Sequence, residues 1–104
     1  MPDPEVIVYR ATEMFRENGI FDPELYFYKG KCLYFADMMM KLYPGSELFS
    51  STDHVMIKIP YEYGDYLWDI RGCHGPVERN PEYRLDYKED LIILMESGDK
   101  AVID

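Results

Sequence analysis

Three side chains of this 104-residue chain have the types and the order needed for nucleophilic catalysis: Cys32, His54 and Asp69. A thiolate attacks a carbonyl carbon where a thiol does not, and the amide groups at a helix N-terminus favour the thiolate. An imidazole can take up the thiol proton, and a carboxylate on its other ring nitrogen fixes the tautomer. The sequence therefore predicts Cys32 as nucleophile, His54 as general base and acid, and Asp69 as the residue that orients His54.

Acyl transfer also needs hydrogen-bond donors for the oxyanion that forms at the attacked carbonyl. The backbone N–H of Cys32 can supply one donor. Tyr28 is the candidate for a second, oxyanion- or substrate-lining group, on its position in the upstream segment alone. Gly30, two residues before Cys32, lets the backbone approach whatever lies over the start of the helix.

The nucleophile is positioned by a helix predicted over residues 32–43, within the stretch GKCLYFADMMMKLYPG. Its apolar side chains cover most of the helix circumference, a pattern typical of a buried helix. Pro44 prevents continuation and Gly45 turns the chain. Cys32 then opens a buried helix.

The base and the orienting residue are positioned by two strands. His54 opens an apolar strand over 54–60, Asp69 lies in a strand over 65–71, and residues 61–64 form the turn between them. Because side chains alternate with a period of two, His54 and Asp69 share a face for any even loop length without a bulge.

The loop length decides whether this pair can form. With Pro60 opposite Asp65, His54 and Asp69 are diagonal neighbours, roughly 7–8 Å apart at the backbone, which their side chains can bridge. An odd loop or a bulge would place them on opposite faces of the sheet. We expect helix 32–43 to cover the His54/Asp69 face, and a further layer to cover the opposite face, which carries Trp68.

The remaining elements complete a single α+β domain over residues 1–104. The sequence predicts a helix over 3–18 with Asp3 as N-cap and Pro4 as first residue, a connector over 20–31, a short strand at 48–51, a loop over 72–84 and a helix over 86–97. The last of these segments also fits a β-hairpin around residues 97–99. The predicted fold is thus a buried Cys-bearing helix packed on a small antiparallel sheet, flanked by N-terminal and C-terminal helices.

Composition narrows the function classes. The chain carries 20 Asp and Glu against 11 Lys and Arg, a net charge of −9, which argues against binding to nucleic acid or an anionic membrane. No apolar run approaches the roughly 18–20 residues of a membrane span, and the start Met-Pro-Asp-Pro-Glu does not resemble a secretory signal. Two cysteines do not form a secreted disulfide framework, so we expect a reducing, cytoplasmic setting.

The segments GKCLYFADMMMKLYPG, DHVMIKI and YLWDIRG resemble the papain-like cysteine hydrolase superfamily, including its NlpC/P60-type and transglutaminase-like branches. The resemblance covers roughly residues 28–72. It implies a papain-like core in which Cys32 opens the central helix, His54 starts a following strand and Asp69 orients it from the next strand. The chain departs from the papain pattern in having no Trp beside Cys32 and no upstream Gln, which leaves the second oxyanion donor unassigned.

Each of the three residues also has a plain structural interpretation. Cys32 can be a small core residue, because free cysteine is among the most buried residue types. His54 can be bonded to Asp53 or to backbone, and Asp69 can pair with a neighbouring basic residue.

A second Cys-His pair lies further along the chain. Cys73 and His74, taken with Cys32 and His54, suggest a metal site, but the usual C-x-x-C spacing is missing, so we expect neither a metal nor a cofactor. His74 is also an alternative base to His54, because it lies in the segment that follows the Asp69 strand.

Two functions follow from these observations. The first is a small cysteine hydrolase or acyltransferase that acts on an amide or thioester bond, with a peptide or other amide as substrate. The alternative is a non-catalytic, acidic interaction module on the same scaffold, either a homodimer or a binder of a basic protein. The acidic surface and the ten Tyr residues are the features that favour the alternative.

Overall fold

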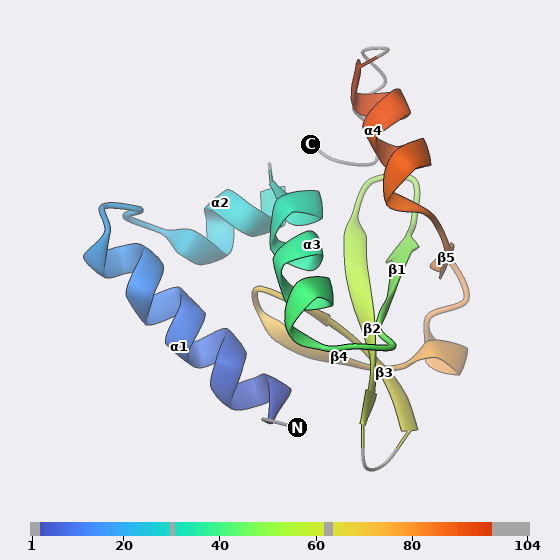
Figure 1. The fold of residues 1–104 in the computed structure, drawn as a ribbon, viewed down its shortest axis with the longest axis horizontal. Helices are drawn as coiled ribbons and strands as arrows, with labels where there is room; N and C mark the ends of the chain where they lie inside the picture. Colours follow the sequence, from blue (N-terminus) through green and yellow to red (C-terminus); the bar gives the residue numbers. More distant parts are fainter. Residues whose placement is uncertain (1–2, 30, 62–63, 97–104) are drawn as a thin grey trace.

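The computed structural model describes residues 3–29, 31–61 and 64–96, and this part of the chain has an α+β fold (Figure 1). Its elements are α1 (Pro4–Glu17), α2 (Pro23–Lys29), α3 (Cys32–Leu42), β1 (Glu47–Ser50), β2 (Val55–Tyr61), β3 (Gly64–Asp69), β4 (Gly72–Pro76), the 3₁₀ turn η1 (Val77–Arg79), β5 (Arg84–Leu85) and α4 (Lys88–Glu96). The strands form one antiparallel sheet in the order β4-β3-β2-β1-β5.

The β2–β3 register confirms the prediction on which the candidate site depends. Pro60 pairs with Asp65, and Ile57 pairs with Trp68, so the ladder runs without a bulge from the turn. His54 lies one residue before β2 and Asp69 is the last residue of β3. The two side chains are therefore diagonal neighbours across adjacent strands.

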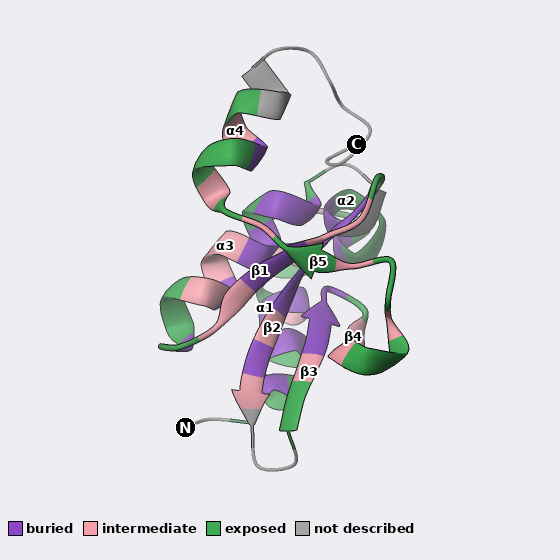
Figure 2. Cartoon of the chain, turned by 90° about the vertical axis from the view of Figure 1, so that its right-hand side faces the viewer, coloured by how far each residue is buried: buried purple, intermediate pink, exposed green. Residues whose placement is uncertain are grey.

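The face of the sheet that α3 covers was predicted wrongly. Buried side chains of α3 belong to one apolar cluster with Val55, Ile57, Ile59 and Trp68, which is the face opposite to Asp69. Val55, Ile57 and Ile59, the β2 residues of that row in the cluster, are β-branched and apolar, whereas the other row contains Met56 and the polar Lys58, so burying the first row against helices removes more apolar surface from water. Figures 1 and 2 show α1, α2 and α3 together on one side of the sheet.

The Asp69 face has a smaller cover of its own. Phe49, Met56 and Leu67 form a second cluster, with Val77 and Tyr83 packed against it. The segment after β4 therefore serves as the second layer in place of a helix. Figure 2 shows that β1, β2 and β3 carry most of the buried strand residues, while β5 is exposed.

The N-terminal helix agrees with its prediction. The Asp3 side chain caps α1 by accepting a hydrogen bond from the N–H of Glu5 at 2.9 Å, Pro4 is the first helical residue, and Gly19 follows the helix end with φ of 97°. One apolar side chain of this helix, Met14, is exposed.

Two segments predicted as irregular contain regular structure. Residues 20–31 hold α2, whose start is capped because the N–H of Leu25 donates to the Asp22 carboxylate at 3.1 Å. Residues 72–84 hold β4, η1 and the first residue of β5. The C-terminal segment is helical over Lys88–Glu96, which confirms the helix rather than the hairpin there, and residues 97–104 lie outside the described part.

Within residues 3–29, 31–61 and 64–96, no helix is both long enough and apolar enough to cross a membrane.

Candidate active site

Cys32 is the first residue of α3 and is buried, with 2% of its surface exposed. The N-cap residue, Lys31, contributes no side-chain hydrogen bond to the helix start, and its carbonyl accepts from the N–H groups of Tyr34 and Phe35. The sulfur therefore lies at a helix N-terminus, where the backbone dipoles favour a negative charge.

His54 is held at the start of β2 by the tight turn from β1. Its carbonyl accepts a hydrogen bond from the N–H of Ser51 at 2.9 Å, and only 6% of the residue is exposed. The Nε2 atom lies 2.9 Å from Oδ2 of Asp69. The ring of Tyr83 stands edge-on to the imidazole, with 6.4 Å between ring centroids. The ring of His54 is thus fixed on several sides.

Asp69 is 3% exposed and receives three hydrogen bonds. Oδ2 accepts from His54, while Oδ1 accepts from Nε2 of His74 at 2.7 Å and from the backbone N–H of Arg71 at 2.8 Å. Burial raises the pKa of this carboxyl, but the hydrogen bonds from the two imidazoles outweigh burial and lower its pKa to about 2. An ionised carboxylate only accepts hydrogen bonds, so Nε2 of both histidines carries a proton.

The Cys32 thiol contacts His54 by a side-chain hydrogen bond. Burial lowers the pKa of His54, but the hydrogen bonds with Asp69 and Cys32 outweigh burial and raise that pKa to about 9. Because Nε2 is bonded to Asp69, Nδ1 is the nitrogen left to face the sulfur. At neutral pH the imidazole is therefore a cation next to the sulfur, an arrangement that favours the thiolate.

The fold thus brings together all three residues predicted as catalytic. They come from the start of α3, the residue before β2 and the end of β3. The body of α3 packs on the opposite face of the sheet, and its first residue, Cys32, interacts with His54 just before the start of β2.

Tyr28, Cys73 and His74 are the other residues that the sequence singled out, and the structure places them differently. Tyr28 lies in α2, but its side chain is outside the described part of the structure. Cys73 is exposed and pairs with Trp68 on the opposite face, while His74 bonds to Asp69. Among the residues that the structure describes, no group of three or more His, Cys, Asp or Glu side chains is placed to hold a metal ion.

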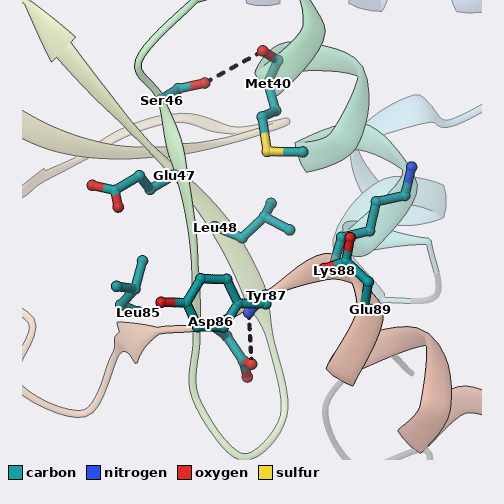
Figure 3. Close-up of a pocket in the computed structure, with 9 residues that line it drawn as sticks. All are labelled: Met40, Ser46, Glu47, Leu48, Leu85, Asp86, Tyr87, Lys88 and Glu89. Atoms are coloured by element: carbon teal, nitrogen blue, oxygen red, sulfur yellow. Dashed lines mark hydrogen bonds between the residues drawn. The ribbon is translucent and has the colours of Figure 1, made fainter.

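A separate cavity lies at the other end of α3 (Figure 3). It has a volume of about 280 Å³ and is lined by Met40, Leu48, Tyr87 and their neighbours from α3, β1 and the segment that leads into α4. Met40 is eight residues beyond Cys32 in the helix, roughly 12 Å along its axis. This cavity is therefore not the binding site of the Cys32 sulfur.

No family model, curated protein or solved structure matches this chain.

The His54–Asp69 pair predicts a defined dependence of stability on pH. The pKa of His54 is raised from 6.5 to about 9, so its contribution is complete below pH 6.5 and is lost as the pH rises through 9. The pKa of Asp69 is lowered from 3.8 to about 2, so its contribution is present above pH 3.8 and is lost as the pH falls towards 2. The free energy of unfolding should therefore be highest between about pH 4 and 6.5, with a fall on the order of 3 kcal/mol across the alkaline limb.

Urea unfolding at a series of pH values measures this profile. The variant His54→Gln should lose most of the alkaline limb, because the titrating imidazole is gone, while general charge repulsion in this acidic protein stays. An alkaline limb that is equally steep in both proteins would assign it to other groups.

Proposed function

We propose that this protein is a small cysteine hydrolase or acyltransferase that acts on an amide or thioester bond from a papain-like core. Cys32 is the nucleophile, His54 the general base and acid, and Asp69 the orienting residue. The observation that carries the proposal is the unbroken series of contacts from the Cys32 thiol to His54 and, at 2.9 Å, from His54 to Asp69. Both cysteines are free thiols, which suits a reducing compartment such as the cytoplasm.

The reaction follows from the charges of this pair. The Cys32 thiolate attacks the carbonyl carbon, and the imidazolium of His54 gives its proton to the leaving amine or thiol as the bond to that group breaks. His54, now neutral, takes a proton from water or from an acceptor nucleophile, which attacks the acyl-enzyme and releases Cys32. Asp69 stays ionised throughout and holds the ring in one orientation.

The oxyanion is stabilised in this proposal by the start of α3. The N–H of Cys32 belongs to the first turn of this helix, so it is a suitable donor for the developing charge. Tyr28 keeps its proposed role as the second donor. Because Cys32 is 2% exposed, a narrow acyl group suits the sulfur better than a folded protein.

Acylation by a simple thioester tests the proposal. Incubation with an acetyl thioester, followed by acid quenching and mass spectrometry of peptides, should place one acetyl group on Cys32. The variant His54→Ala should be acylated more slowly by about 10²–10⁴-fold, because the proton donor to the leaving group is lost. Cys73→Ser is the matched control and should behave as the unaltered protein. Equal acylation of Cys73 and Cys32 would contradict the proposal.

A second candidate function is a non-catalytic module that binds a basic protein or forms a homodimer. It is favoured by the apolar side chains exposed on and beside α1 and α2, namely Val6, Tyr9, Met14, Phe21, Leu25 and Tyr26, of which Phe21 is 97% exposed. The net charge of −9 makes a basic partner the better electrostatic match. Size-exclusion chromatography with light scattering separates the two: a strict monomer that acylates Cys32 supports the enzyme, and a stable dimer that fails to do so supports the module.

A further inference from the structure

Asp69 occupies the central strand of a three-strand arrangement in which both neighbouring strands supply a histidine. His54 comes from the start of β2 and bonds Oδ2 at 2.9 Å, and His74 comes from β4 and bonds Oδ1 at 2.7 Å. We infer that His74 is a positioning residue for the catalytic pair: it holds Oδ1 and keeps water from the carboxylate, so that Oδ2 stays on His54. The catalytic consequence rests on the proposed function, whereas the effect on His54 does not.

The local backbone is built to aim His74 at this carboxylate. Asp69 pairs with Gly72 and Trp68 with Cys73, but Tyr66 pairs with Pro76, so β4 carries one extra residue opposite Leu67. This is a β-bulge, which bends a strand and redirects a side chain. Gly75 takes up the bulge with a φ of 91°, a value that other residues rarely adopt.

The turn after β4 fixes the backbone of His74. The side-chain amide of Asn80 donates to the carbonyl of His74 at 3.1 Å and to that of Pro76 at 2.9 Å. Asp69 therefore holds the ring of His74, and Asn80, the residue after η1, holds its backbone carbonyl. A surface histidine that contacted Asp69 by chance would not require hydrogen bonds to both its ring and its backbone carbonyl.

The three hydrogen-bonded side chains differ in burial, and His74 is the most exposed of them. The side chains of Asp69 and His54 are 3% and 8% exposed, and that of His74 is 31% exposed. His74 thus lies between the carboxylate and solvent. Water at a carboxylate weakens its attraction for a cation, because the interaction falls as the local dielectric constant rises. The Arg71 N–H also holds Oδ1, so the specific contribution of His74 is a second donor together with cover.

The test is an NMR titration of the histidine rings in the full chain, which needs no turnover. In His74→Ala, which removes both donor and cover, the pKa of His54 should fall by about one unit from its value near 9. In His74→Gln, which keeps a donor at similar reach, most of that shift should be absent. The matched control Glu78→Ala, an exposed change on η1, should leave His54 unaltered.

His74→Leu covers the case in which the alanine variant does not fold, because leucine retains cover without a donor. An unchanged His54 titration in the folded alanine or leucine variant would overturn the inference. Acylation of Cys32 is measured in parallel on the same variants. A shifted His54 in a protein that never acylates Cys32 refutes the enzyme and leaves the positioning role standing, so the two failures are distinguishable.

Discussion

Replacement of Asp69 by alanine is expected to lower the free energy of unfolding by about 3–5 kcal/mol, because it leaves a buried, charged partner without compensation. The carboxylate is 3% exposed and accepts hydrogen bonds from His54, His74 and the backbone of Arg71. All three donors lose an acceptor at once, and His54 must give up its charge. For a domain whose whole stability is about 5–15 kcal/mol, this is a large fraction.

The matched control lies on the same strand. Asp65 is exposed and stands 3.8 Å from the Lys58 amine, so Asp65→Ala should cost at most about 1 kcal/mol. Urea unfolding at pH 6, where the His54–Asp69 contribution is complete, compares the two variants. A loss at position 69 no greater than that at position 65 would show that the buried pair is not a stabilising element.

The positions of the first two helices show how a local signal succeeds or fails with context. Asp3-Pro4-Glu5 predicted the start of α1, and the same three residue types at 22–24 start α2. The second occurrence was missed because a seven-residue helix is too short to display helical periodicity, and Tyr26 and Tyr28 alternate with apolar residues as a strand would. A capping signal carries information even where the periodic signal is weak.

The β2–β3 hairpin shows what a pattern of alternation determines. The even turn length predicted which side chains share a face, and therefore the His54–Asp69 pair, in agreement with the observed register. Alternation alone does not say which face the helices cover. That outcome depends on the competition between two rows of side chains for apolar burial, and the row with Val55, Ile57 and Ile59 is the more apolar.

The bond from His74 to Asp69 was hidden by the prediction of a loop over residues 72–84. Glycine and proline usually mark loops, but an edge strand tolerates proline, and a β-bulge often takes glycine. β4 is an edge strand with Gly75 in its bulge and Pro76 at its end. Several glycine and proline residues directly after a strand are therefore compatible with a short antiparallel return strand. A residue among them, such as His74, can then occupy a functional position.

Alkylation of Cys32 by iodoacetamide at pH 7 is expected to be slower by about 10-fold or more when His54 is replaced by alanine. The expectation follows from the position of Cys32 at a helix start and from the imidazolium of His54, whose pKa of about 9 keeps it charged at that pH. Because Cys32 is buried, its absolute rate reflects access as well as the charge beside the sulfur, so the ratio of rates between variants is the informative quantity.

The variants Cys73→Ser and Cys32→Ser isolate one thiol each, so the exposed Cys73 provides the comparison within the same chain. Adding His54→Ala to the first variant should slow the alkylation of Cys32, since the cation beside the sulfur is removed, whereas adding it to the second should leave the rate of Cys73 unaltered. Adding Asp69→Asn tests the next link: if the carboxylate maintains the charge on His54, Cys32 should again be alkylated more slowly, by less than in His54→Ala. Equal rates for Cys32 with and without His54→Ala would mean that His54 does not activate the sulfur, and the nucleophile would have to be abandoned while the stabilising role of the His54–Asp69 pair remained intact.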